Sequence, residues 1–243
     1  MAGTRAAELL AVVLAESADG TDLPSRLLSA CAGTLPVSGA GLALMTDKGP
    51  AGTVAASDGV ALELEELQFS LGEGPCVDAS RTGRPVLQPD LAVTAPLRWP
   101  AFASGALSAG IRAVFALPLR VGAIRLGVLD LYRDGPGPLG AGELREALDF
   151  SDAATLLLLH LQSADRAAGP EWGQISPIDD RAEVHQATGV VSVQADVGLA
   201  EALLLLRARA FAEHRPIGEL ARDVLEGIVD FRRGYEGTED GRT

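Results

Sequence analysis

The sequence has few of the residues that build metal centres. It contains two cysteines, Cys31 and Cys76, and three histidines, His160, His185 and His214, with no CxxC pair among them. A structural zinc site needs about four Cys or His ligands in local pairs. We therefore expect no metal and no cofactor. We interpret both thiols as reduced, as is usual in the cytoplasm.

Basic residues and long apolar runs are also scarce. Lys and Arg total 20 against 33 Asp and Glu, so the net charge is −13, and Lys48 is the only lysine. This balance argues against a broad basic surface for nucleic acid but leaves a small local contact open. The longest leucine runs, 156–159 and 203–206, fall far short of a membrane span, and Glu8 and Asp19 interrupt any signal peptide. The sequence predicts a soluble cytoplasmic protein.

The first two thirds of the chain predict an α+β fold. A length of 243 residues suits one large domain or two small ones, and 47% hydrophobic residues allow a packed core. The patterns predict helices over 5–31 (with a break near 19–24), 59–70 and 140–168, a helix start near Trp99, and strands over 40–45, 52–57, 85–87 and 111–132. Pro118 inside the last strand pair indicates an edge or a bulge.

The last third predicts helices only. Residues 169–178 (GPEWGQISPI) interrupt the pattern and are interpreted as a linker. We then expect three helices: from Ser176-Pro177 to about Val193, from Gly198 to His214, and from Pro216 to Phe231. The tail, 234–243, is expected to be disordered. The predicted domains are therefore 5–168 and 179–233.

The helical region contains four distinctive segments: 185–194 (HQATGVVSVQ), 199–202 (LAEA), 206–210 (LRARA) and 220–224 (LARDV). With these segments, the region of about 179–231 resembles the ANTAR domain, a family of RNA-binding antiterminator modules. Thr188 stands where the family often has lysine, Ser192 where it commonly has methionine, and Gly198 where it has a serine or threonine cap. The missing lysine removes one expected phosphate contact.

The resemblance implies an RNA surface on the first two of these helices. The candidate RNA-binding residues are Gln186, Thr188, Gly189, Arg207, Arg209 and Arg215. Arg207 and Arg209 lie about 200° apart on an ideal helix, so both cannot face one ligand. Arg207 is equally compatible with an internal ion pair or a helix cap, Gly189 with helix packing, and Arg215 with a solvated loop. With so few basic groups, a homodimer on one RNA is expected to gain avidity.

The second of these helices carries four successive leucines, Leu203 to Leu206, which span 300° of its circumference. Such a helix must be buried on several sides. One side is expected to contact its two neighbouring helices. Another is expected to meet a second subunit or the N-terminal domain, unless the helix is simply well buried. The third helix is expected to bury one apolar stripe, formed by Ile217, Leu220, Ala221, Val224, Leu225 and Ile228. Its outer face carries Glu219, Arg222, Asp223, Glu226 and Asp230, and this acidic face should repel RNA.

The N-terminal region contains the segments 71–76 (LGEGPC), 84–86 (RPV) and 126–132 (LGVLDLY). With these segments, it resembles a GAF domain over about 5–165. A GAF domain followed by an ANTAR domain is a known arrangement in bacterial regulators. The resemblance implies an antiparallel sheet flanked by helices that encloses a small ligand, and a role in sensing or dimerisation.

The candidate ligand-binding residues of this region are Cys76, Trp99, Phe102 and Asp130. Cys76 could instead be a small residue that closes a loop, and the two aromatic rings could belong to the core. Asp130 could cap a neighbouring loop. The helix over 140–168 is interpreted as a dimer and signal helix, or as one that only packs on the sheet.

Together these patterns predict a bacterial transcription antitermination regulator that binds hairpin RNA in a nascent transcript. We expect no catalysis, because the sequence has no G-x-S-x-G, no P-loop and no paired metal ligands. Two alternatives stay open. The helical unit could dock on a protein partner without touching RNA, or Cys76 could serve a thiol-based redox enzyme.

Overall fold

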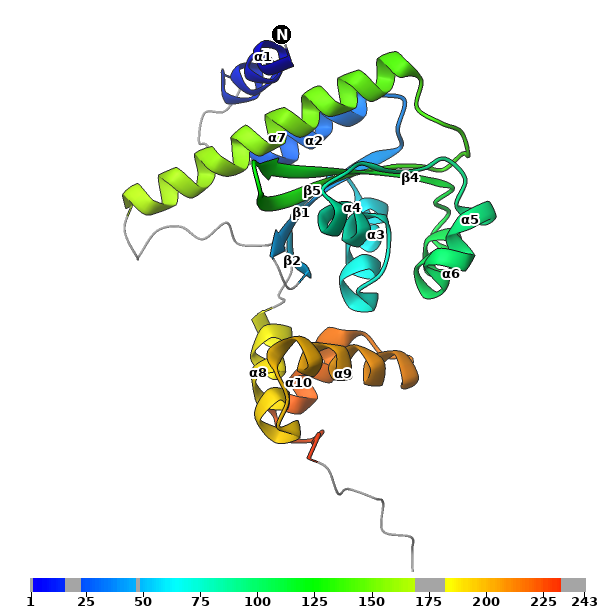
Figure 1. The fold of residues 1–243 in the computed structure, drawn as a ribbon, viewed down its shortest axis with the longest axis vertical. Coiled ribbons are helices and arrows are strands. Elements are labelled where there is room, and N and C mark those ends of the chain that lie inside the picture. The colour runs from blue at the N-terminus through cyan, green and yellow to red at the C-terminus, as the bar shows by residue number, and fades with distance from the viewer. Residues whose placement is uncertain (1, 16–22, 47–48, 169–181, 233–243) are drawn as a thin grey trace, which may run out of the picture. The chain divides into compact units, whose positions relative to one another are not determined.

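The computed structural model describes residues 2–15, 23–46, 49–168 and 182–232 (Figure 1). The chain divides into two compact units, Met1–Asp179 (unit 1) and Asp180–Thr243 (unit 2). The predicted linker, residues 169–178, and the predicted disordered tail, residues 234–243, lie outside the described residues. Each unit is considered by itself below.

Unit 1 is built on one antiparallel sheet, as the α+β prediction expected. Its strand order is β2-β1-β5-β4-β3, and all the pairings are antiparallel. The strands are β1 (Gly39–Thr46), β2 (Gly49–Ala56), β3 (Val86–Gln88), β4 (Ala113–Val121) and β5 (Ile124–Arg133). Gly122, with φ of 60°, makes the tight turn between β4 and β5. The predicted strands are confirmed, although Ile111 lies just before β4.

Helices cover both faces of this sheet (Figure 1). One face carries α2 (Leu23–Thr34) and α7 (Ala141–Ala168), and α1 (Ala2–Ala15) packs on these two helices. The other carries α3 (Gly59–Leu71), α4 (Pro75–Thr82), α5 (Leu91–Arg98) and α6 (Pro100–Ser108). The sheet is thus buried on both sides, which explains its nearly continuous apolar sequence.

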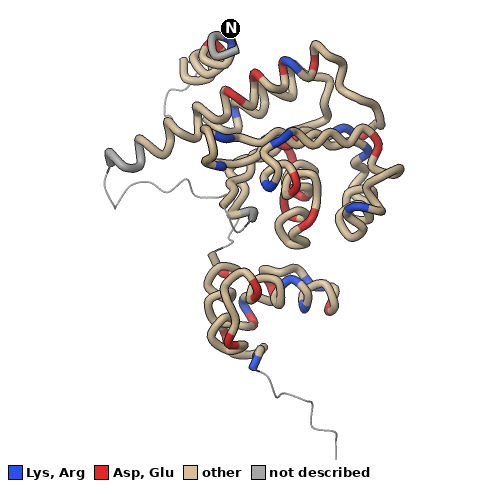
Figure 2. The backbone as a smooth tube through the Cα atoms, viewed as in Figure 1, with Lys and Arg blue, Asp and Glu red and all other residues tan. Residues whose placement is uncertain are grey.

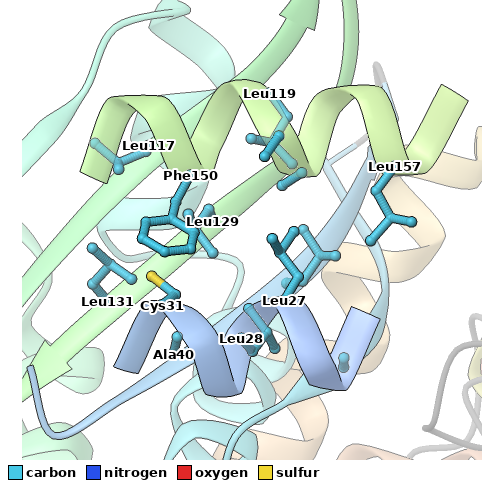
Figure 3. Close-up of a cluster of buried hydrophobic side chains, with 14 of the residues drawn as sticks. Leu27, Leu28, Cys31, Ala40, Leu117, Leu119, Leu129, Leu131, Phe150 and Leu157 are labelled. Carbon is cyan, nitrogen blue, oxygen red and sulfur yellow. The ribbon is translucent and has the colours of Figure 1, made fainter. Parts of the chain in front are cut away.

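The larger apolar core lies between the sheet and α2 and α7 (Figure 3). Successive side chains of a strand point to opposite faces, so Leu117 and Leu119 of β4 point toward this core, where they meet Phe150 of α7. Cys31 of α2 is buried in the same core. Burial, reinforced by the charge of Glu146, raises the pKa of the Cys31 thiol to about 12.

Two helices of unit 1 were not predicted from the sequence. Residues 71–100, expected to be mostly irregular, contain α4 and α5. Pro75 occupies the first turn of α4, where a missing N–H costs nothing. Asp90 caps α5 by accepting a hydrogen bond from the Ala92 N–H at 3.0 Å.

The expectation for Pro118 is confirmed. The short strand β3 pairs with β4 only at residues 114–116, so Pro118 lies on an open edge. The register of β4 against β5 also shifts between Leu119 and Arg120, next to the proline. An edge position beside a bulge is where a strand tolerates proline.

Unit 2 contains three helices in its described residues, α8 (Ala182–Ala195), α9 (Leu199–Ala212) and α10 (Ile217–Leu225). The expected start at Ser176-Pro177 lies outside the described residues. The prediction that the third helix reaches Phe231 is wrong, because α10 ends at Leu225 and Gly227 follows with φ of 74°. Ile228, expected in the buried stripe of this helix, is consequently exposed.

The described helices were compared with the length and hydropathy that a membrane-spanning helix requires. No single one is long and apolar enough to cross a bilayer, and only α8 and α9 taken as a pair pass on length and composition. These two helices are bent by 103° relative to each other.

Asp58 joins the start of α3 to β5. Its Oδ1 accepts hydrogen bonds from the Ala61 N–H at 2.8 Å and the Tyr132 hydroxyl at 3.0 Å, and its Oδ2 accepts one from Ser57 Oγ at 2.7 Å. Partial burial would raise the pKa of Asp58, but these hydrogen bonds outweigh it and lower the pKa. The ionised carboxylate therefore stabilises the folded state.

We expect this contribution to be complete above the usual aspartate pKa of about 3.9 and to disappear as the pH falls through the lowered native value. Urea unfolding of the wild type and of Asp58→Asn, followed across that acidic range, measures it. The stability gap between the two proteins should narrow as the pH falls. A constant gap would show that the carboxylate charge is not what stabilises this junction.

Candidate functional site

Four buried polar side chains lie on the α3/α4 side of the sheet. Glu65 and Gln68 come from α3, Cys76 from the first turn of α4, and Asp130 from β5. Asp130 is fully buried, and the other three are at most 2% exposed. We call this group the acid–thiol cluster. Fully buried carboxyl groups are rare unless they have a specific partner, so the cluster is the first candidate for function in unit 1.

Gln68 connects the members of the acid–thiol cluster. Its Nε2 donates a hydrogen bond to Asp130 Oδ2 at 3.1 Å, and its Oε1 accepts one from the Cys76 N–H at 2.7 Å. One carboxylate oxygen from each of Glu65 and Asp130 lies within 4.8 Å of the other and of Cys76 Sγ. A single amide thus fixes the start of α4 against the middle of the sheet.

Two glycines leave the space that the cluster occupies. Gly41 of β1 is paired with Asp130, and a Cβ atom on Gly41 would lie 2.3 Å from Glu65 Oε1. Gly74 has φ of 135°, and its Cβ would lie 2.7 Å from Gln68 Oε1. A side chain at either position would collide with the cluster.

Glu73, between the glycines of the GEGPC segment, has a separate role. Its Oε1 accepts hydrogen bonds from the backbone N–H groups of Ala101 and Phe102, both at 2.9 Å. These groups belong to the first turn of α6, where N–H groups lack helical partners. The segment therefore positions Cys76 and also caps α6.

The cluster holds two carboxyl groups and a thiol away from water. Burial raises the pKa of Asp130 to about 6, although its polar contacts with Cys76, Glu65 and Gln68 favour the ionised form. Asp130 Oδ1 is buried and has no hydrogen-bond partner in the described part of the chain. Carboxylate oxygens and a thiol sulfur are also the groups that ligate divalent metals.

The four predicted ligand-binding residues of unit 1 all lie on the same side of the sheet. Cys76 and Asp130 meet in the acid–thiol cluster. Trp99 and Phe102 lie in the apolar core of this side, to which Cys76 also belongs, with their rings edge to face and 6.2 Å apart. Trp99 Nε1 donates a hydrogen bond to Asp78 Oδ2 at 3.2 Å. Ligand binding by these four residues stays a prediction.

Sequence reasoning missed Glu65 and Gln68. The buried positions of α3 are Ala61, Leu64, Glu65, Gln68 and Phe69, which follow the spacing of one helix face. A glutamate and a glutamine at two of these core positions are the feature of the sequence that could have indicated a buried polar site.

A cleft of about 250 Å³ lies on the opposite side of the sheet, at α1, α2 and α7. Its lining residues are Arg5, Glu8, Leu9, Val12, Val13, Ala30, Thr34 and Phe150. Arg5 pairs with Glu8 at 3.4 Å. The lining is mostly apolar and includes none of the predicted ligand-binding residues.

In unit 2, the three predicted RNA-binding residues of α8 have different surroundings. Gln186 is exposed. A Cβ atom on Gly189 would meet nothing within 4 Å, so helix packing within the described unit does not require this glycine. Thr188 is buried, and its hydroxyl donates a hydrogen bond to the Val184 carbonyl at 2.6 Å. The Thr188 hydroxyl is therefore engaged within its own helix, and its contact with RNA stays a prediction.

Each of the three predicted arginines of unit 2 is engaged or half-buried, and acidic and basic residues are interspersed in this unit (Figure 2). Arg209 pairs with Glu213 at 2.7 Å and lies over the ring of Phe231. Arg215 pairs with Asp223 at 2.7 Å. Arg207 is half-buried, with its Nε and Nη2 atoms in the interior. Carboxylates of unit 2 therefore neutralise two of the three predicted arginines.

Comparison with known proteins identifies the fold of unit 1. A family model described as a GAF domain matches residues 18–173, which is more than half of the chain. This match ends before α8, so the ANTAR resemblance of residues 179–231 stays a prediction. No curated protein matches the chain.

One solved structure shares this fold. A domain of a protein described as a two-component sensor histidine kinase from Sinorhizobium meliloti 1021 is 18% identical, with a TM-score of 0.51; the match covers 63% of this chain and 99% of that one. At this identity the similarity concerns the fold alone. The chain is also similar to the GAF domain of the Acinetobacter phosphoenolpyruvate-protein phosphotransferase, at 10% identity and a TM-score of 0.49, covering 66% and 93%.

Proposed function

The chain belongs to the GAF domain family, and on that premise we propose that it is a signal-responsive regulator of transcription. Unit 1 senses a small ligand and dimerises. Unit 2 binds hairpin RNA in a nascent transcript and thereby prevents termination. We assign no catalysis to the chain.

The observation that carries the RNA proposal is an exposed face on α8. Gln186, Gly189 and Val193 lie three to seven positions apart, on one side of this helix. Gln186 and Val193 are exposed, and a Cβ atom on Gly189 would meet open space. A glutamine amide can bond to unpaired bases, and a glycine allows a nucleic-acid backbone to approach closely. We call these three residues the α8 face.

Arg222 of α10 is the best candidate for a phosphate contact beside this face. It pairs with Glu183 of α8 at 3.0 Å, and its side chain is 55% exposed. An exposed ion pair contributes little to stability, so a phosphate can replace Glu183 at small cost. Arg209 and Arg215 are held by carboxylates of their own unit and are weaker candidates.

The test is a filter-binding titration of the full chain with a pool of two-hairpin RNAs of randomised loop sequence. We expect binding that weakens as the salt concentration rises from ~50 to ~200 mM, because phosphate contacts release counterions. Arg222→Ala should lower by about 1 the slope of the logarithm of the affinity against the logarithm of the salt concentration. Gln186→Ala should weaken the binding of the selected RNAs by roughly tenfold. Arg5→Ala, in unit 1, is the matched control.

Absence of binding to every RNA at low salt would contradict the proposal. So would selected RNAs that bind Gln186→Ala and Arg222→Ala as tightly as the wild type. Far-ultraviolet circular dichroism of each variant establishes that unit 2 is folded.

A specific observation favours the alternative that unit 2 docks on a protein. Of the four successive leucines in α9, Leu203 and Leu206 are buried, whereas Leu204 is 64% exposed. Phe211, seven positions further on and so on the same side, is 61% exposed. An exposed apolar strip of this kind fits another protein surface or a second subunit better than RNA. Protein docking alone predicts no salt-dependent RNA binding in the titration above.

A further inference from the structure

We propose that the acid–thiol cluster is a binding site for a divalent metal ion that favours thiolate ligands, with Glu65, Cys76 and Asp130 as its protein ligands. The proposal concerns unit 1 alone. It stands whether or not unit 2 binds RNA.

The first support is the convergence of three ligand atoms from three separate elements. One carboxylate oxygen of Glu65, one of Asp130 and the Cys76 sulfur all lie within 4.8 Å of one another. Zinc binds cysteine sulfur at about 2.3 Å and carboxylate oxygen at about 2.0–2.2 Å, so two such ligand atoms of a tetrahedral ion lie roughly 3.4–3.6 Å apart. Side-chain rotations that shorten the present separations by at most about 1.4 Å bring the three atoms around one ion.

The second support is independent of this spacing. Asp130 is fully buried, and its Oδ1 has no hydrogen-bond partner within the described residues. A buried carboxylate oxygen without a partner is unfavourable, since it has lost its bonds to water. A cation inside the cluster supplies the missing partner. It also offsets the negative charge of ligands held in a medium of low dielectric constant.

The surrounding structure preserves this arrangement. Gly41 leaves the space into which the Glu65 carboxyl projects, since a Cβ atom there would lie 2.3 Å from Oε1. Gln68 holds Asp130 Oδ2 through its Nε2 and the Cys76 backbone through its Oε1. Partners that orient the ligands in this way are usual around metal sites.

The ligand chemistry selects the ion. Thiolate ligands favour zinc and other soft or borderline metals, whereas magnesium and calcium prefer oxygen ligands alone. Zinc is therefore the expected ion. Three protein ligands leave one position of a tetrahedral zinc ion for a ligand from outside the chain, as in zinc sites that are not purely structural.

The site escaped the sequence analysis for a simple reason. Zinc sites are recognised by local pairs of Cys and His, and this cluster has one cysteine and no histidine. Its three ligands are also far apart in the sequence, on α3, α4 and β5.

The experiment is a titration of the full-length, tag-free and chelator-treated chain with Co²⁺ under reducing, anaerobic conditions, followed by competition with Zn²⁺. We expect one Co²⁺ per chain, with the absorption band of thiolate-to-cobalt charge transfer, which Zn²⁺ then removes. Cys76→Ser should abolish that band and weaken Zn²⁺ binding by at least ~100-fold. Cys31→Ser is the matched control, because Cys31 is the other buried thiol and lies in the core on the other side of the sheet.

Three results would overturn the proposal: no charge-transfer band, a band that survives Cys76→Ser, or a band that is lost in Cys31→Ser. If Cys76→Ser does not fold, as judged by circular dichroism, Glu65→Gln and Asp130→Asn provide the same test with the thiol intact. Each should weaken Zn²⁺ binding at least tenfold and alter the visible cobalt spectrum, and unchanged binding in both refutes the site. Failure of the RNA titration leaves these readouts unaffected.

Discussion

Replacing Gly127 with alanine should lower the free energy of unfolding of unit 1 by about 3 kcal/mol or more. Gly127 lies in β5 where that strand pairs with β1, in the middle of the sheet. A Cβ atom there would lie 2.3 Å from the carbonyl oxygen of Ala43. That oxygen belongs to the backbone of β1, so the clash can be relieved only by moving the two strands apart.

Urea unfolding followed by far-ultraviolet circular dichroism measures this effect. Gly33→Ala is the matched control, because Gly33 lies in α2 and a Cβ atom there meets nothing within 4 Å. Alanine is the better helix former, so the control should gain roughly 0.5–1 kcal/mol. Similar stabilities for the two variants would show that β1 and β5 do not approach as closely as the structure has them.

The sheet of unit 1 could be predicted because its signal is local. In β4 the bulky residues Phe115, Leu117 and Leu119 recur at every second position, which is the period of a strand. Gly122 marks the turn to β5. These features depend only on near neighbours in the sequence, so they can be recognised without knowledge of the fold.

The short helices α4 and α5 could not be predicted because distant contacts hold them. Each has eight residues and lies in a segment rich in glycine and proline, where helix propensity is low. Asp78 of α4 pairs with Arg98 at the end of α5, and it accepts a hydrogen bond from Trp99. These partners are about twenty positions away, beyond the reach of any periodic pattern.

Two of the four residues of the acid–thiol cluster were predicted from the sequence as candidate ligand-binding residues. The GAF resemblance pointed to Cys76 and Asp130, but their proximity depends on the sheet register that pairs Asp130 with Gly41. Glu65 and Gln68 enter the cluster only because α3 turns that side toward the sheet. A polar residue at a core position of a helix indicates a buried polar contact, but the sequence does not identify the residue on the other side of that contact.

The arginines of unit 2 show the same limit. Helix geometry predicts only that Arg207 and Arg209 cannot both face one ligand. It did not reveal that Arg215 is engaged by Asp223, an acid that had been assigned to an outer face repelling RNA. Acidic residues near an arginine in space, rather than in sequence, decide whether its charge is available.

Replacing Gln68 with leucine should destabilise unit 1 by about 2–5 kcal/mol in the metal-free protein. Leucine fills nearly the same volume but leaves Asp130 Oδ2 and the Cys76 N–H, both buried, without their present partner. Ser70→Ala is the control from the same helix. Its hydroxyl bonds only to the side chain of Glu66, so its loss should change the stability by at most ~0.5 kcal/mol.

Urea unfolding with and without saturating Zn²⁺ then separates the two roles of the cluster. Metal that binds only the folded protein stabilises it in proportion to the logarithm of the free metal concentration over the dissociation constant. Gln68→Leu keeps all three proposed ligands, so Zn²⁺ should recover part of its lost stability, whereas Cys76→Ser should gain almost nothing. If Gln68→Leu unfolds like the wild type, the hydrogen bonds that close the cluster do not hold the domain together.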